Sequence, residues 1–132
     1  MKTVEVVAAI IIHDGKILCA QRGNNQLAYL SGKFEFPGGK LEKDETLEQA
    51  LIREIQEELN ISITVADFLQ TVKHQYPDFK IIMHAFICHT QSQTLTLNEH
   101  LQALWLDITQ LDTLDWAAAD LPIVQQLKTI MS

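Results

Sequence analysis

Short runs of β-branched and aromatic residues, separated by polar or turn-forming segments, predict a chain that is rich in strands. The runs lie at residues 4–12, 16–21, 33–36, 61–75, 80–90 and 101–107. Asp14 and Gly15, between the first two runs, are a strong two-residue hairpin signal. The two longest runs flank a break at residues 76–78, so we expect them to be neighbouring strands. Trp105, in the last run, is expected in the core.

Two other stretches have the pattern of helices. Thr46 and Gln49 form a capping box, which predicts that the first helix begins at about Thr46, and Asn60 suits the left-handed position that follows its last turn. The apolar arc expected to face the core consists of Leu51, Ile52, Ile55 and Leu59. The second helix begins near Asp120, a candidate N-cap, with Pro122 in its first turn.

Strands before and after one helix, with a second helix at the end, predict a mixed β-sheet between helices, an α/β or α+β fold. With 132 residues, the chain is expected to form one domain over residues 1–132. The net charge of −7 argues against a sequence-independent nucleic-acid binder, because the phosphate backbone requires a basic patch. Glu5 interrupts the apolar start, which argues against a signal peptide or a membrane span.

The cysteines and histidines have no metal-binding pattern. Cys19 and Cys88 lie far apart inside apolar runs, so we expect buried free thiols in a reducing cytoplasm. The five histidines lack zinc-ligand spacing, and none is assigned to a metal. No feature of the sequence indicates an oligomeric state.

An acidic cluster is the strongest chemical signal. Glu54, Glu57 and Glu58 are three and four residues apart, so they project from one helical face and repel each other. One interpretation is a solvated acidic face with an ordinary ion pair between Arg53 and Glu57. The other is that the carboxylates bind Mg²⁺ or Mn²⁺, which prefer oxygen ligands and bridge to substrate phosphates.

The stretch at residues 39–61 resembles the Nudix box of MutT-like pyrophosphohydrolases. That signature is Gly, five residues, Glu, seven residues, and then Arg-Glu-apolar-any-Glu-Glu-any-Gly-apolar. It is met here by Gly39, Glu45, Arg53, Glu54, Ile55, Glu57, Glu58 and Ile61. Asn60 replaces the Gly of the signature, and Asn is the usual second choice for a left-handed cap. The resemblance favours the metal interpretation.

The resemblance covers nearly the whole chain, including FEFPGGK before the helix and AADLP near the end. Within the family, the chain looks most like the bacterial CTP pyrophosphohydrolase branch. The resemblance implies a Nudix-type α/β/α sandwich and a hydrolase that splits a nucleoside triphosphate into a nucleoside monophosphate and pyrophosphate. It also implies two or three bound Mg²⁺ ions, with Mn²⁺ as an alternative.

The resemblance further implies roles for single residues. The expected metal ligands are the Gly38 carbonyl, Glu54, Glu57, Glu58 and Glu99. Glu54 would also lie next to the nucleophilic water, and Glu99, on a polar loop, would be a further ligand or base. Arg53 is expected to orient the glutamates, while Glu45 holds the loop and Arg53. Purely structural roles remain the alternative for Arg53 and Glu45, and Gly39 is a structural part of the motif.

Base recognition is expected from Arg22, at the start of a polar loop, and from Phe36, Phe79 and Asp120. A carboxylate accepts hydrogen bonds from exocyclic amino groups, including N4 of cytosine, so Asp120 favours cytosine. Relatives that process oxidised guanine triphosphates tend to carry Asn there. Guanine also offers donors, and an N-cap role explains Asp120 equally well. Arg22 has the alternative of a solubilising residue, and both phenylalanines have the alternative of core positions.

The leading hypothesis is therefore hydrolysis of CTP, dCTP or a modified pyrimidine triphosphate, a small-molecule nucleotide substrate. The alternatives are 8-oxo-dGTP or another oxidised nucleotide, ADP-ribose or a dinucleoside polyphosphate, and a non-catalytic nucleotide-binding module. The intact glutamates of the motif argue against the last. The motif indicates the pyrophosphate but not the groups on either side of it.

Overall fold

The computed structural model describes residues 1–131 and gives this part of the chain a strand-rich fold. The strands are β1 (Lys2–His13), β2 (Lys16–Gln21), β3 (Phe34–Glu35), β4 (Gly38–Lys40), β5 (Thr64–Gln75), β6 (Phe79–His89) and β7 (Gln102–Leu106). The helices are α1 (Leu47–Leu59), the short 3-10 helices η1 (Ile108–Thr113) and η2 (Ala118–Asp120), and α2 (Leu121–Met131). The strands and helices predicted from sequence are all present.

The strands form one mixed sheet in the order β3-β2-β1-β6-β5, with β4 paired to β1 and β7 paired to β2. The central strand β1 runs parallel to β6, from the pair Lys2 and Phe79 to the pair Ile12 and His89. The pairs β1–β2 and β5–β6 are antiparallel, as expected for hairpins. Asp14 and Gly15 both have positive φ, 51° and 73°, which matches the predicted two-residue turn.

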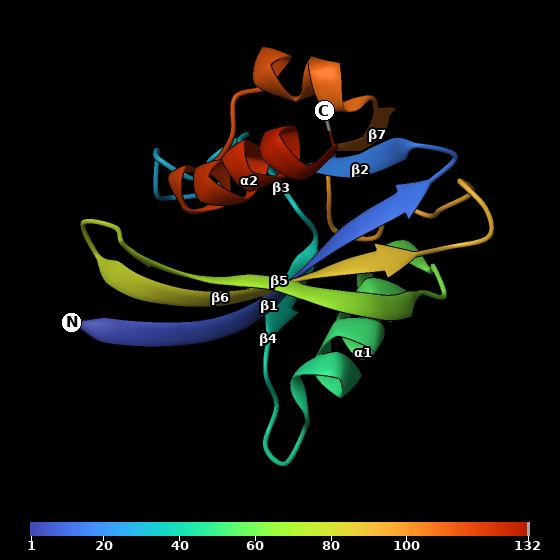
Figure 1. Ribbon diagram of the computed structural model, residues 1–132. Coiled ribbons are helices and arrows are strands. Elements are labelled where there is room, and N and C mark those ends of the chain that lie inside the picture. Colours follow the sequence, from blue (N-terminus) through green and yellow to red (C-terminus); the bar gives the residue numbers. More distant parts are fainter. Residues whose placement is uncertain (132) are drawn as a thin grey trace.

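The sheet carries a separate hydrophobic core on each face (Figure 1), with α1 on one side and α2 on the other. Along β1, Val7, Ala9 and Ile11 are buried under α1, whereas Ala8 and Ile10 are buried on the face covered by α2. A strand buried on both faces reads as a continuous apolar run, which is the pattern of residues 6–12. The predicted α/β/α sandwich is therefore confirmed.

Helix α1 begins and ends as predicted. The Thr46 hydroxyl accepts from the Gln49 backbone N–H, the Gln49 side chain accepts from the Thr46 N–H, and Asn60 has a φ of 55°. The apolar arc is wrong at one position, because Ile52 is 45% exposed. Ile52 lies at one margin of the arc at 100° per residue, and Glu58, just beyond the opposite margin, is buried instead.

Three further details concern β4, the tryptophans and the cysteines. Gly38 and Gly39 begin β4 and pair with β1. Trp105 is half-buried and donates from its indole to the Gln93 carbonyl at 3.1 Å, whereas Trp116 is the deeply buried tryptophan. Cys19 and Cys88 are buried free thiols, as predicted. No helix within residues 1–131 is long and apolar enough to cross a membrane.

Candidate active site

Glu58 is a carboxylic acid in the interior of the protein, on the inner side of α1. The residue is 6% exposed, and among the described residues its Oε2 atom has no hydrogen-bond partner. Burial, together with the charges of Glu35, Glu99 and Glu54, raises its pKa to about 9. A buried carboxylate amid three others is electrostatically costly unless it is protonated or bound to a cation.

The polar loop that carries Glu99 is attached to the last turn of α1. The Thr96 N–H donates to the Leu59 carbonyl at 2.9 Å, and the Asn98 N–H donates to the Glu58 carbonyl at 3.1 Å. The Asn98 amide donates to the Glu57 carbonyl at 2.8 Å. The final carbonyls of a helix lack partners within the helix, so these bonds complete α1 and hold Glu99 near Glu58.

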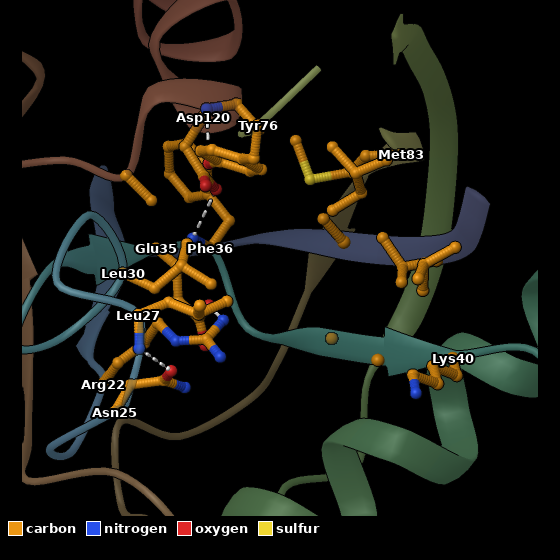
Figure 2. A pocket seen from close by; sticks show the side chains of 18 of the residues that line it. Arg22, Asn25, Leu27, Leu30, Glu35, Phe36, Lys40, Tyr76, Met83 and Asp120 are labelled. Carbon is orange, nitrogen blue, oxygen red and sulfur yellow. Dashed lines mark hydrogen bonds and ion pairs between the residues drawn. The ribbon is translucent and has the colours of Figure 1, made fainter. Parts of the chain in front are cut away.

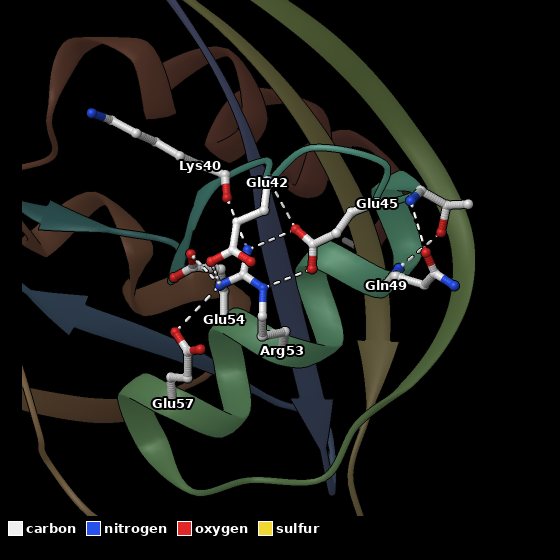
Figure 3. A network of polar contacts seen from close by, with 8 residues as sticks. Lys40, Glu42, Glu45, Gln49, Arg53, Glu54 and Glu57 are labelled. Atoms are coloured by element: carbon white, nitrogen blue, oxygen red, sulfur yellow. Dashed lines mark hydrogen bonds and ion pairs between the residues drawn. The ribbon is translucent and has the colours of Figure 1, made fainter.

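Arg53 lies on the outer side of the glutamates and joins them to the preceding loop (Figure 3). It donates to both Glu45 oxygens, at 2.7 and 2.8 Å, and to Glu54 at 2.9 Å. It also donates to Glu57 at 3.3 Å and to the Lys40 carbonyl at 3.1 Å. The hydrogen bond from Arg53 lowers the pKa of Glu45 to about 2. One guanidinium therefore orients two motif glutamates and the loop.

The two glycines of β4 allow the backbone to pass between the sheet and α1. A Cβ atom on Gly38 would lie 1.9 Å from the Val7 carbonyl oxygen, and one on Gly39 would lie 2.3 Å from Glu54 Oε2. Neither separation is sterically allowed, so no other residue fits without movement. Burial raises the pKa of Glu54, which Arg53 opposes.

A cavity of about 660 Å³ connects this region to a second polar region (Figure 2). On the side of the motif, the cavity is lined by Gly38, Gly39 and Glu58, together with Glu99 from the polar loop. The four predicted base contacts, Arg22, Phe36, Phe79 and Asp120, also line it. Glu54 and Glu57 are not among its lining residues. Below, the motif side is called the acidic end, and the side at Phe36, Tyr76 and Asp120 is called the base end.

Asp120 is buried at the base end, where it is 5% exposed. Its Oδ1 accepts from the Phe36 backbone N–H at 3.0 Å. The residue belongs to the 3-10 helix η2 and not to an extended cap, so the predicted N-cap role is wrong. Burial raises the pKa of Asp120 well above its usual value, and the charge of Glu35 adds to this.

Glu35 lies between the two ends and was missed as a site residue in the sequence, although FEFPGGK contains it. Arg22 donates to Glu35 Oε1 at 2.9 Å, and His100 Nε2 is 2.9 Å from Glu35 Oε2. Arg22 is thus ion-paired and not simply solubilising. The other ring nitrogen of His100 is buried and has no partner among the described residues. The sequence signal that could have identified Glu35 is its charge, three positions before the glycine pair.

The aromatic candidates differ in their packing. Phe36 is 3% exposed and lies 4.7 Å from the Trp116 ring, so it is a core residue that also lines the cavity. Phe79 is half-buried, with its ring 5.2 Å from that of Tyr76. Tyr76, which the sequence presents only as part of a break, is 4% exposed and lines the base end.

The motif carboxylates do not converge on one point. Within residues 1–131, no group of three or more acidic, histidine or cysteine side chains is gathered as a metal site. Glu54 and Glu57 turn toward Arg53, whereas Glu58 lies among the charges of Glu35 and Glu99. The unpartnered Glu58 oxygen, in a field of other carboxylates, nevertheless fits a hard cation with oxygen ligands.

The sequence profile described as NUDIX domain matches residues 6–126. The chain belongs to the Nudix family. A CTP pyrophosphohydrolase from Escherichia coli is 39% identical over 95% of this Nudix chain and 91% of its own length. An 8-oxo-dGTP diphosphatase from Proteus vulgaris is 42% identical over 68% of this chain and 80% of its own length.

The fold agrees with that of a similar protein of known structure. The solution structure of the Escherichia coli ORF135 protein superposes with a TM-score of 0.83 at 37% identity, covering 100% of this chain and 93% of that one. The family and the named relatives make this Nudix protein a hydrolase of phosphoric anhydrides. Nudix hydrolases act on small nucleotide substrates and generally use divalent metal ions such as Mg²⁺.

Proposed function

We propose that the enzyme hydrolyses CTP, dCTP or a modified pyrimidine triphosphate to a nucleoside monophosphate and pyrophosphate, with Mg²⁺ as cofactor. The observation that carries this proposal is a single cavity with Glu58 and Glu99 on one side and Asp120 on the other. The acidic end suits a metal-bound polyphosphate, and the base end suits a base that offers an amino group.

At the acidic end, the residues that would hold the metal are the Gly38 carbonyl, Glu54, Glu57, Glu58 and Glu99. When bound, Mg²⁺ neutralises the phosphate oxygens and increases the acidity of a bound water. Glu58, whose pKa is raised to about 9 by burial, must lose its proton to bind a cation. Release of Arg53 from Glu54 or Glu57 would supply further oxygen atoms, so Arg53 positions these carboxylates before binding.

Glu54 is the proposed acceptor of the proton of the attacking water. Water forms a bond to phosphorus, the anhydride bond breaks, and the leaving phosphate takes the electron pair. Burial raises the pKa of Glu54, which makes it a stronger base than an exposed carboxylate. Gly39, whose backbone passes directly against Glu54, keeps this side chain in place.

At the base end, Asp120 accepts from the amino group of the base, Phe36 and Phe79 form apolar walls, and Arg22 contributes positive charge near Glu35. The identity of 39% to an enzyme named CTP pyrophosphohydrolase supports this choice. A second candidate is an oxidised purine triphosphate, supported by the relative named 8-oxo-dGTP diphosphatase at 42% identity.

A substrate panel tests the proposal. We expect the highest kcat/KM for a cytosine triphosphate among CTP, dCTP, 5-modified dCTP, UTP, 8-oxo-dGTP and ADP-ribose, with Mg²⁺ or Mn²⁺. Activity should disappear in EDTA and fall strongly in Glu57→Gln. Labelled water should enter one product only. A higher kcat/KM for 8-oxo-dGTP than for every pyrimidine would replace the first candidate by the second, and unchanged turnover in EDTA would refute the metal mechanism.

A further inference from the structure

Tyr76 is held rigidly at the base end of the cavity. It occupies the turn between β5 and β6 and is 4% exposed. Its ring stacks on Tyr29 with centroids 5.0 Å apart and an interplanar angle of 17°, and His74 meets it edge-on at 4.5 Å. Aromatic contacts of this kind fix the ring plane, so the hydroxyl has a defined position.

The Tyr76 hydroxyl uses its oxygen as an acceptor, and its hydrogen remains available for donation. Its oxygen accepts from the Ala119 backbone N–H at 2.9 Å, and within residues 1–131 no acceptor receives its hydrogen. The hydroxyl lies next to the Asp120 carboxyl (Figure 2), and the charge of Asp120 acts on it. Because a phenol both accepts and donates, Tyr76 is set here as a donor toward the cavity.

We propose that the Tyr76 hydroxyl donates to the ring nitrogen N3 of a bound cytosine while Asp120 accepts from its N4 amino group, which makes Tyr76 a specificity-determining residue. The inference rests on the proposed function, since it assumes a cytosine triphosphate. It adds to that function the residue and the substrate atom that separate cytosine from uracil.

The two side chains differ in how strictly they read the base. The Asp120 carboxyl already accepts from the Phe36 N–H through Oδ1, and it can also accept from an amino group of the base. Guanine carries an amino group as cytosine does, so Asp120 alone does not fix the base. Tyr76 has its oxygen occupied by Ala119, so it rejects a base with N–H at this position, as uracil has. An unmatched polar group in a buried site costs affinity.

A purely structural role for Tyr76 makes a different prediction. Tyr76→Phe leaves the Ala119 N–H without its partner, which would lower stability and affect all substrates alike. The inference instead requires that the loss depend on N3. In 3-deaza-CTP, a C–H group replaces N3, so enzyme and substrate can be changed separately at the two ends of the proposed hydrogen bond.

The experiment is a four-way comparison of kcat/KM for wild type and Tyr76→Phe with CTP and 3-deaza-CTP. We expect about a tenfold loss for either change alone and no further loss when both are made together. Independent, multiplying losses would overturn the inference. Tyr29→Phe is the matched control, because it keeps the ring that stacks on Tyr76 and removes only a hydroxyl that donates to Asp78 at 2.7 Å. It should leave the ratio of the two substrates unchanged.

If Tyr76→Phe fails to fold, the wild-type enzyme alone still tests the inference. Its kcat/KM should be about tenfold higher for CTP than for 3-deaza-CTP, and equal values would overturn the inference. Hydrolysis of CTP with no dependence on N3 removes only the inference and leaves the proposed function intact. Failure to release pyrophosphate from CTP, with activity on other triphosphates, overturns both.

Discussion

The two ends of the cavity are built from opposite kinds of chemistry. The acidic end concentrates like charges, with Glu58 buried near Glu35, Glu54 and Glu99, and Arg53 compensates only from the outer side. At the base end, polar side chains are paired one to one with backbone N–H groups, Asp120 with Phe36 and Tyr76 with Ala119. Repulsion between like charges suits binding of a cation, whereas rigidly held polar groups suit selection between similar bases.

If this contrast holds, changes at the acidic end alter the rate for every substrate. We expect Glu58→Gln to lower kcat/KM by at least about 100-fold while leaving the ratio of CTP to UTP unchanged. Pyrophosphate release with both nucleotides measures this. Glu48→Gln, on an exposed site of the same helix, is the matched control and should retain activity. A changed base preference in Glu58→Gln would break the contrast.

A steric change in β4 tests how the acidic end is held. Gly39→Ala places a Cβ atom 2.3 Å from Glu54 Oε2, the far end of a flexible side chain, so we expect the carboxylate to be displaced, with reduced turnover and a loss of less than about 1 kcal/mol in the free energy of unfolding. Denaturant unfolding and kcat/KM measure the two effects. Gly23→Ala is the control, because within the described residues a Cβ there meets no atom within 4 Å. Wild-type turnover in Gly39→Ala would contradict the placement of Glu54 against β4.

The pH dependence of stability should also come from the acidic end. The pKa of Glu58 is raised by burial from 4.5 to about 9, so the folded state binds the additional proton between these values. Metal-free protein should therefore lose stability as pH rises from about 5 to 9, by at most about 1.4 kcal/mol per pH unit from this group.

The comparison for this pH effect is Glu58→Gln, which removes the ionisable group with little change in volume. Thermal melts in EDTA at several pH values should show a smaller decline for the variant than for wild type. Added Mg²⁺ should stabilise wild type most at high pH, where the carboxylate is ionised. Parallel pH profiles for the two proteins would show that Glu58 is not the group responsible.

The smallest effect is expected at the base end, from Asp120→Asn. Asn keeps an acceptor for the Phe36 N–H, so its stability should lie within about 0.5 kcal/mol of wild type, with a change of up to about tenfold in the ratio of CTP to UTP. Asp120→Ala leaves that N–H unpaired, which costs about 1–3 kcal/mol. An unchanged ratio in both variants would remove Asp120 from base reading.

The acidic end was largely predictable from sequence because its signals are local. The capping box, Asn60 and the spacing of the glutamates lie within one helix and its flanks, where neighbours in sequence are neighbours in space. The error there concerned the buried arc of the helix, which was expected to include Ile52 and left out the carboxylate of Glu58. This carboxylate is buried, although charged residues are rarely found in protein interiors.

The base end depends on contacts between distant segments, so sequence revealed only part of it. Phe36 and Asp120 are joined across 84 residues, and Tyr76 and Ala119 across 43. Asp120 was recognised as a candidate because a carboxylate has a distinctive chemistry. Tyr76 was not, because Pro77 and Asp78 mark its segment as a turn, and only the folded sheet brings that turn beside η2.

The loop at residues 91–100 shares the last hydrogen-bonding groups of α1, through Thr96 and Asn98. Fraying of the helix end and release of the loop are therefore one event, not two. A single local opening would separate Glu99 from Glu58 and dismantle the cation site while the base end stayed formed. We expect such an opening to leave a state that holds the base without chemistry. Its population would depend on these three hydrogen bonds and on the loop's other contacts, Trp105 with Gln93 and His100 with Glu35.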